Sequence, residues 1–204
     1  MKHCLYIFVL AAMFCSCRPT EQIELVTRSC APMPKGRASA CCCTLDGKAY
    51  VFGGRDAAGQ YCNDLWAYDP IGDTWTALGS APLLPRVNAT MAAVGGQLYV
   101  GLGYAADHAY RDTAYLRDWW TYSPATGNWT RCNDYPTANT VAVSSYTVDG
   151  YIYALYGFGY GYTKDIFRYD INADTWTQVE RVSDRAWPHR QSLSNTRRYE
   201  RARW

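Results

Sequence analysis

Net charge, histidine and long hydrophobic stretches are all scarce in this chain. Lys and Arg exceed Asp and Glu by only two over 204 residues, which is too small an excess to indicate a nucleic acid-binding protein. The longest apolar run, Leu5 to Phe14, is too short for a helix that crosses a bilayer. Only three His are present, and CxxC, HExxH, GxSxG and phosphate-loop motifs are missing. We therefore expect no metal site and no other cofactor.

The N-terminus has the features of an export signal. Lys2 and His3 precede the apolar run, and FCSCRPT follows it. A Cys after a small residue at this place resembles the lipobox of bacterial lipoproteins, which predicts a signal peptide over residues 1–17 with Cys17 as the lipidated residue. The alternative is a plain secretory signal. Both interpretations export the chain, either to the periplasm or as a lipoprotein of the outer membrane and cell envelope, with membrane contact only through the lipid anchor.

Six Cys follow Cys17, and two interpretations of them stay open. In an exported protein they could form disulfides. The run Cys41 to Cys43 favours the other interpretation, because successive side chains of a strand point to opposite faces and small thiols suit a tightly packed inner strand.

Aromatic residues recur at a fixed spacing. Three times a Tyr is followed seven residues later by a Trp, and the successive Trp lie 54 and 47 positions apart. The pairs are Tyr68 and Trp75, Tyr122 and Trp129, and Tyr169 and Trp176. Helical periodicity is rare, whereas many apolar runs of four to seven residues are bounded by Gly, Pro, Asp or Asn. The sequence therefore predicts an all-β protein whose repeated unit has the length of a β-propeller blade.

The sequence of each unit predicts four strands. In the first, RASACCCTL, KAYVFGG, DLWAYDP and TWTALGS are separated by turns. Asp46-Gly47 is the strongest hairpin signal, because a type I′ turn needs positive φ at both central positions. The other two units carry Gly95-Gly96 and Asp149-Gly150 at this place. The predicted boundaries of the units are about 37–85, 86–135 and 136–180.

YVFGG, NDLWAYDP and the following TW resemble the kelch repeat, to which residues 37–180 are similar throughout. GLGY and YLRDWWTYSPATGNW are particularly similar to kelch lipoproteins of Bacteroidetes-type bacteria, whose propellers are galactose oxidase-like. The strand-ending glycines of the repeat correspond to Gly53, Gly54, Gly103 and Gly157. The resemblance implies an all-β kelch β-propeller with about three four-stranded blades. Because a propeller has roughly four to eight blades, we expect an incomplete ring, a truncated chain and self-association through exposed blade faces.

Both ends of the repeat region depart from the pattern. Residues 18–36 resemble the outermost strand and exit loop of a preceding blade, without its Trp. Residues 181–204 hold seven Arg and no Gly, a composition typical of a disordered basic tail. We favour instead an out-of-frame translation of a further kelch unit, which the nucleotide sequence would test.

The repeated Tyr and Trp are expected to pack sheet against sheet and not to bind a ligand. Candidate binding residues lie in the loops after the second strands: Tyr104, Tyr110, Phe158 and Tyr160, with Tyr162 beside them. Arg37 and Arg86 open the first strands of two units. The resemblance implies that this position approaches the central mouth, where an Arg could hold an anion. The alternative for both is a loop cap or a salt bridge.

Binding without catalysis is the first expectation: an exported propeller that recognises a glycan or a protein through its blade loops, impaired by truncation. The alternative is a carbohydrate-active enzyme like the kelch-type sialic acid mutarotases (epimerases), which need a general acid and base beside an anion-holding Arg. A copper oxidase of the galactose oxidase type is not expected, because only His108 and His189 remain after processing. No catalytic residue is assigned.

Overall fold

The computed structural model describes residues 29–105, 115–137, 140–159 and 162–181. The chain divides into two compact units, Met1–Cys30 and Ala31–Trp204, and every element below belongs to the second. Within the described ranges the chain forms strands and turns, with no α-helix. The predicted signal peptide with Cys17 and the tail beyond residue 181 lie outside these ranges.

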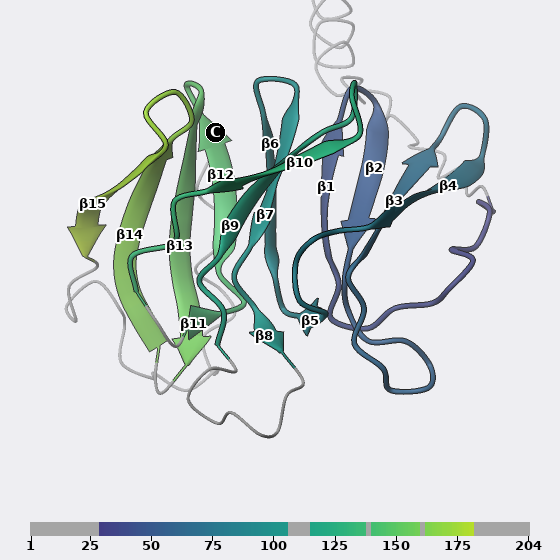
Figure 1. Cartoon of the computed structure of the whole chain (residues 1–204), viewed down its shortest axis with the longest axis horizontal. Coiled ribbons are helices and arrows are strands. Elements are labelled where there is room, and N and C mark those ends of the chain that lie inside the picture. The colour runs from purple at the N-terminus through teal and green to yellow at the C-terminus, as the bar shows by residue number, and fades with distance from the viewer. Residues whose placement is uncertain (1–28, 106–114, 138–139, 160–161, 182–204) are drawn as a thin grey trace, which may run out of the picture. The chain divides into compact units, whose positions relative to one another are not determined.

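Three antiparallel sheets follow one another along the chain (Figure 1). The first, in the order β1-β2-β3-β4, consists of β1 (Cys41–Leu45), β2 (Lys48–Phe52), β3 (Asp64–Asp69) and β4 (Thr74–Ser80). The second, in the order β6-β7-β9-β10, consists of β6 (Thr90–Val94), β7 (Gln97–Gly101), β9 (Trp119–Ser123) and β10 (Asn128–Cys132). The third consists of β12 (Ser144–Val148), β13 (Tyr151–Gly159), β14 (Tyr162–Asp170) and β15 (Thr175–Arg181). The prediction of an all-β chain with about three four-stranded units is confirmed.

Three short strands supplement the sheets. β5 (Arg86–Val87) pairs with β8 (Tyr104–Ala105), and β11 (Thr140–Val141) pairs with the end of β13. Both pairings lie where the chain enters or leaves a sheet, so they tie the loops to the blades.

The turns between the first two strands have the predicted backbone. Asp46 and Gly47 have φ of 50° and 74°, and Asp149 and Gly150 have φ of 50° and 80°. Positive φ at both central residues gives a tight turn whose twist matches that of the flanking strands. These turns fix the register that places alternate side chains on the two faces of each sheet.

The sheets bury their apolar faces against one another. Between the first and second sheets, Phe52 and Leu65 lie in one cluster with Leu98, Val100 and Tyr122. Between the second and third sheets, Tyr99 and Trp119 cluster with Ile152 and Tyr169. A third cluster holds Leu102, Tyr135, Val143, Ala154 and Phe167. The core therefore lies between the sheets, as in the blades of a propeller.

The Tyr and Trp of each repeat are direct cross-strand partners. Tyr68 pairs with Trp75, Tyr122 with Trp129, and Tyr169 with Trp176. The ring centroids of the three pairs are 5.0, 4.9 and 4.8 Å apart. An interval of seven residues spans a short turn and returns the Trp beside its Tyr, which explains the recurring spacing.

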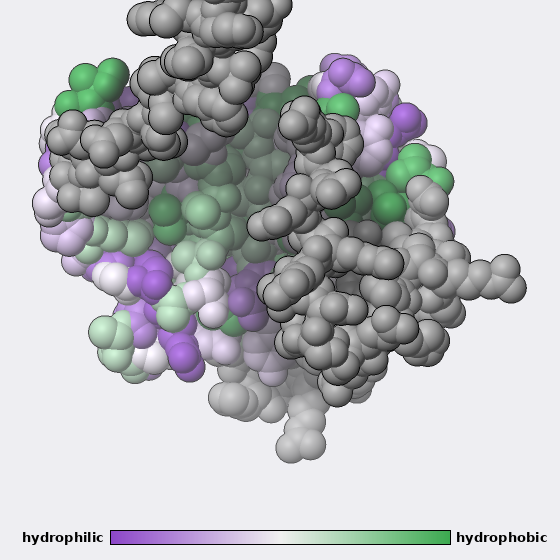
Figure 2. Space-filling model, turned by 180° about the vertical axis from the view of Figure 1, so that it is seen from behind, coloured by the Kyte–Doolittle hydropathy of each residue, from purple (hydrophilic) through white to green (hydrophobic). Residues whose placement is uncertain are grey.

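The innermost strands β1, β6 and β12 lie side by side and are linked by side-chain hydrogen bonds. Thr90 Oγ1 donates to the carbonyl of Val143 at 2.7 Å, and Ser145 Oγ donates to the carbonyl of Met91 at 2.9 Å. Figure 2 views the molecule from behind and shows a hollow with hydrophobic surface at its centre.

The cysteines of the described residues are free thiols. Cys41 is buried, Cys42 is exposed and Cys43 is half-buried, which is the alternation expected of β1. Burial raises the pKa of Cys41, and it raises the pKa of Cys43 to about 12.

Candidate functional site

The longer loops gather at one end of the sheets. Strand direction alternates within each sheet, so the loops after the second strands share an end with the segments that enter the next sheet. We call this the loop end; it comprises residues 53–63, 84–89, 102–105, 115–118 and 140–143. The short strands β5, β8 and β11 mark it in Figure 1. Of the candidate binding residues named from the sequence, Arg86 and Tyr104 belong to this end.

Arg86 lies at the loop end with a guanidinium that is fully engaged. Its side chain is 0% exposed, and Nη1 and Nη2 donate to the two carboxylate oxygens of Asp118 at 2.7 and 2.9 Å. Nε donates to the carbonyl of Leu84 at 2.8 Å, and Nη1 also donates to the carbonyl of Leu102 at 3.0 Å. The bidentate pair joins the segment before β6 to the segment before β9.

Arg37 occupies the corresponding place in the first sheet, and its environment differs. Nη2 pairs with Oδ2 of Asp64, and the Arg side chain is 3% exposed. Nε and Nη1 of Arg37 and Oδ1 of Asp64 are buried and have no hydrogen-bond partner within the described residues. The structure therefore places both candidate arginines in salt bridges, with Arg37 less completely satisfied than Arg86.

In the third sheet the position of the arginines is held by Thr140. Asp165, which corresponds to Asp64 and Asp118, accepts a hydrogen bond from Nε2 of Gln178 at 2.9 Å. An outer-strand amide thus contacts the carboxylate that an arginine contacts in the other two sheets.

The acidic partners of the arginines were not identified from the sequence. Asp64 also accepts from the indole of Trp66 at 2.7 Å, and Asp118 accepts from the indole of Trp120 at 3.0 Å. The signal was present as Asp-x-Trp at the start of the third strand in two units and as Asp165-Ile-Phe in the third.

Tyr104 is the candidate aromatic whose side chain the structure describes. It is half-buried in β8, and its ring meets that of Tyr115 edge to face with centroids 5.5 Å apart. The backbone of Phe158 lies in β13, opposite Val141 and Tyr162. Tyr110 and Tyr160 lie outside the described residues. Other exposed groups of the loop end are Arg55, Leu84 and Arg117.

Glycines allow the backbone to turn sharply at the loop end. Gly54 and Gly103 have φ of 89° and 93°, and a Cβ on Gly103 would lie 2.7 Å from the carbonyl oxygen of Val87. A side chain is excluded at both places by conformation and by space. Gly157 lies inside β13 and pairs with Thr163, so the third unit uses its glycine in an extended strand.

Backbone hydrogen bonds link the three sheets at the start of the innermost strands. Ser39, Asn88 and Ala142 have φ of 57°, 52° and 54°, in the left-handed region. The Asn88 N–H donates to the carbonyl of Ser39 at 2.9 Å, and the Ala142 N–H donates to the carbonyl of Asn88 at 3.2 Å. One residue of each unit thus adopts the same unusual conformation to reach its neighbour.

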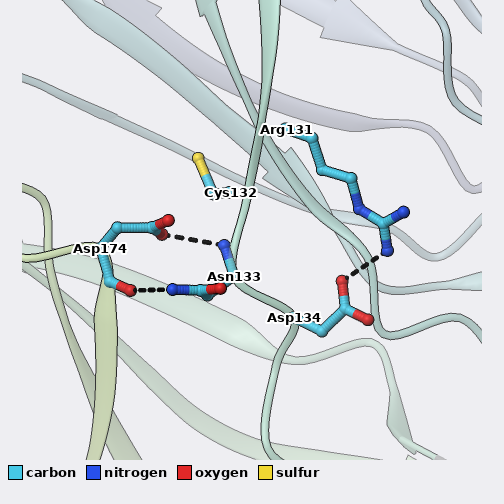
Figure 3. Close-up of a pocket in the computed structure, with 5 residues that line it drawn as sticks. All are labelled: Arg131, Cys132, Asn133, Asp134 and Asp174. Atoms are coloured by element: carbon cyan, nitrogen blue, oxygen red, sulfur yellow. Dashed lines mark hydrogen bonds and ion pairs between the residues drawn. The ribbon is translucent and has the colours of Figure 1, made fainter.

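A polar depression lies on the outer rim between the second and third sheets (Figure 3). Asn133 binds Asp174 twice: its N–H donates to Oδ1 at 2.9 Å, and its side-chain amide donates to the carbonyl at 2.6 Å. Arg131 pairs with Asp134 at 2.8 Å, and Cys132 completes the lining. The polar groups bond one another, and the two hydrogen bonds between Asn133 and Asp174 join the second sheet to the third.

Next to the depression, the Tyr169 hydroxyl donates to Asp174 Oδ1 at 2.6 Å. Burial, followed by the hydrogen bonds to Asp174 and Cys132, raises the pKa of Tyr169. Burial also raises the pKa of Cys132. Both groups are therefore held in their protonated forms, which favours a structural over a nucleophilic role.

Within the described residues, no group of three His, Cys, Asp or Glu is arranged to hold a metal ion. The same residues contain no helix long and apolar enough to cross a membrane.

A family model described as the KLHDC2/KLHL20/DRC7 Kelch-repeats domain matches residues 6–197. Kelch-like protein 25 of Xenopus tropicalis is 32% identical over 111 residues, which are 52% of this chain and 18% of that protein. N-acetylneuraminate epimerase of Pasteurella multocida (strain Pm70) is 42% identical over 60 residues, 27% of this chain and 16% of that protein. A putative F-box/kelch-repeat protein of Arabidopsis thaliana is 29% identical over 160 residues, 72% of this chain and 42% of that protein.

The solved structure of YjhT is similar with a TM-score of 0.64 at 22% sequence identity, over 76% of this chain and 55% of that one. This likeness shows the fold. The chain spans less than half the length of the three curated relatives and about half that of YjhT.

Proposed function

Because the chain belongs to the kelch-repeat family, we propose that it is a binding module that recognises a glycan or a protein through the loop end of its blades. We also propose that it is exported, with residues 1–17 as the signal peptide and Cys17 as a lipid anchor. Kelch domains generally mediate protein binding, so a protein is the first partner to test.

The observation that carries this proposal is the contrast between the two kinds of candidate residue at the loop end. Arg37 and Arg86 are both held in salt bridges, whereas the Tyr104 and Tyr115 rings are half-exposed. Aromatic rings that keep one face accessible suit stacking on a sugar or packing against a protein side chain.

The test is a glycan array and a pull-down with the full chain, followed by Tyr104→Ala. We expect the variant to lose binding at least about tenfold, since ligand contacts of aromatic residues often contribute about 2 kcal/mol or more. Ile71→Ala is the matched control: Ile71 is 93% exposed and lies in the β3–β4 turn, away from the loop end. Circular dichroism of both variants separates lost binding from lost folding. Equal binding by Tyr104→Ala and wild type would contradict the proposal.

The second candidate function is sugar mutarotation of the sialic acid type. It is favoured by the 42% identity to N-acetylneuraminate epimerase, although the match covers 60 residues. Proton NMR of sialic acid would detect accelerated anomer exchange, whereas a binding module would retain its ligand unchanged. Exchange that disappears in Arg37→Ala and Arg86→Ala variants that remain folded would support the enzyme. A complete-length homologue without exchange would exclude it.

We propose further that the chain alone has weak activity of either kind, because the mouth of a propeller is formed by all of its blades. A soluble monomer of residues 18–204 that unfolds cooperatively and binds with full affinity would contradict this.

A further inference from the structure

Each sheet has two faces that repeat from unit to unit. The preceding face packs on the sheet that comes before it in the chain. In the second and third sheets it is formed by Leu98, Val100, Tyr122 and Trp129, and by Ile152, Ala154, Tyr169 and Trp176. The following face packs on the sheet that comes after. In the first and second sheets it is formed by Tyr50, Phe52, Leu65 and Ala67, and by Ala92, Tyr99 and Trp119.

Two of these faces are not covered by another described sheet. On the following face of the third sheet, Tyr146 is 57% exposed and Val148 is 51% exposed. Tyr153, Leu155 and Ile166 on the same face are half-exposed. The preceding face of the first sheet is likewise open: Cys42 is exposed, and Ala49, Val51, Tyr68 and Trp75 are half-exposed. Most of the corresponding residues at the two internal junctions are buried, and the others are half-buried.

We propose that these two faces are partners, so that the third sheet of one copy of the chain docks on the first sheet of a second copy. The same contact made twice gives a closed two-copy ring with a two-fold axis. The contact is head-to-tail, and such contacts close into a ring when the rotation per subunit permits. Three sheets from each copy give six, which falls within the range of known propellers.

The backbone at the ends of the array supports this partnership. Ala142 corresponds to Asn88, whose carbonyl accepts from the next unit, so the carbonyl of Ala142 is placed to accept from Ser39 N–H of a second copy. Ser144 corresponds to Thr90, whose hydroxyl donates to Val143. The Ser144 hydroxyl is therefore placed to donate to the carbonyl of Ala40 of the second copy, the residue that corresponds to Val143.

Arg168 provides a specific element. It takes the place of Ala67 and Thr121 on the following face, its guanidinium carbon lies 4.6 Å from the centroid of the Tyr151 ring, and its Nε is buried without a partner within the described residues. Ala67 belongs to the cluster of Tyr122 and Trp129. By the same register Arg168 is placed against the Tyr68 and Trp75 rings of the second copy in a cation–π arrangement, at a position that Ala67 and Thr121 hold in the other two sheets.

In the assembly, Ala31 of one copy and Glu180 of the other would compete for the hydrogen bond of the Trp75 indole. The Trp176 indole donates to the carbonyl of Asn133 at 3.1 Å, and the Trp75 indole donates to the carbonyl of Ala31 at 3.0 Å. Glu180 of the third sheet corresponds to Asn133 of the second sheet. On assembly, the Trp75 indole would therefore donate to the carbonyl of Glu180 of the second copy in place of that of Ala31. The Ala31 N–H, which donates to Asp73 at 2.7 Å, should then lose protection from hydrogen exchange.

The first test is the mass of the full chain by light scattering after size-exclusion chromatography. We expect twice the mass of one chain at about 100 µM, and Val148→Asp should raise the dissociation constant at least about tenfold, because it places an unpaired charge where Leu45 and Val94 are half-buried at the internal junctions. Ile71→Asp adds the same charge at a residue outside both faces and should leave the mass unchanged. A monomer at this concentration would overturn the proposal, and so would a series of larger, open assemblies.

The second test traps the contact covalently. Ser145 of β12 bonds the Met91 carbonyl, next to Ala92 of β6; by analogy the thiol introduced by Tyr146→Cys is placed near Cys42 of the second copy, and both positions are exposed in the single chain. Mild oxidation should link two chains through the introduced thiol of one copy and Cys42 of the other, as mass spectrometry of peptides would show. The double variant Tyr146→Cys/Cys42→Ser should not link. Linkage to the same extent in the double variant would count against the proposed register.

Discussion

Replacing Asp118 by Ala tests whether the buried salt bridges, and not only apolar packing, stabilise the blades. The variant leaves Arg86, whose side chain is 0% exposed, with two carbonyl acceptors and no counter-charge. Removing one partner of a buried pair typically costs about 3–5 kcal/mol, because the other charge stays buried and uncompensated. Asp118 is itself 20% exposed, so water reaches the site and we place the loss near the lower end, at about 3 kcal/mol. The lost hydrogen bond from Trp120 is included in that value.

The assay is urea unfolding of the full chain, followed by tryptophan fluorescence. With a slope of about 1–3 kcal/mol/M in urea, a loss of about 3 kcal/mol lowers the midpoint by roughly 1–3 M. Asp134→Ala is the matched control, because its pair with Arg131 is exposed and should contribute less than about 1 kcal/mol.

A second variant removes the charge and its partner together. Arg86→Met/Asp118→Leu should recover at least half of the lost stability, since apolar residues of similar volume often replace a buried pair without penalty. If Asp118→Ala is no less stable than Asp134→Ala, the salt bridge does not stabilise the fold and the assignment of Arg86 to the scaffold is wrong.

Three further outcomes follow from local chemistry. Burial raises the pKa of Tyr135 from 10.0 to about 12, so the stability it confers is present below about pH 10 and is lost as the pH rises toward 12. Urea titrations over this range should show a smaller fall in Tyr135→Phe than in wild type, and identical falls would contradict the assignment. Ala142→Gly should raise the free energy of unfolding by up to about 1 kcal/mol, because φ of 54° strains a residue with a Cβ, and a destabilised variant in thermal melts would count against this. Thiol alkylation at about pH 8, followed by mass spectrometry, should modify the exposed Cys42 well before the buried Cys41, and equal rates would show that β1 opens readily.

The parts of the fold that the sequence predicted are those governed by local chemistry. The Tyr and Trp spacing is set by a short turn between two paired strands, and the Asp-Gly turns are set by the φ that they require. Both signals lie within about ten residues, so neither depends on knowledge of distant contacts. The alternation of Cys41 and Cys42 was predictable for the same reason.

The environment of the arginines could not be predicted in this way. The interval from Arg86 to Asp118 is 32 residues, and only the folded second sheet brings the two side chains together. The sequence left a choice between an anion-holding Arg and a salt bridge, and nothing local could decide it. The recurring Asp two residues before an aromatic residue was the available clue, since Trp66 donates to Asp64 and Trp120 donates to Asp118.

The proposed ring and the proposed function make a joint prediction about concentration. A site confined to the second sheet, such as the Tyr104 and Tyr115 rings, is present in every single chain and should bind with one affinity at all concentrations. A site at the central mouth needs several sheets around it and should appear only above the dissociation constant of the two-copy assembly. Binding measured with wild type and with Val148→Asp at the same chain concentration distinguishes the two. Loss of binding in Val148→Asp, with Tyr104 intact, assigns the ligand to the mouth; unchanged binding assigns it to the loop end of one sheet and leaves the assembly to be judged by mass alone.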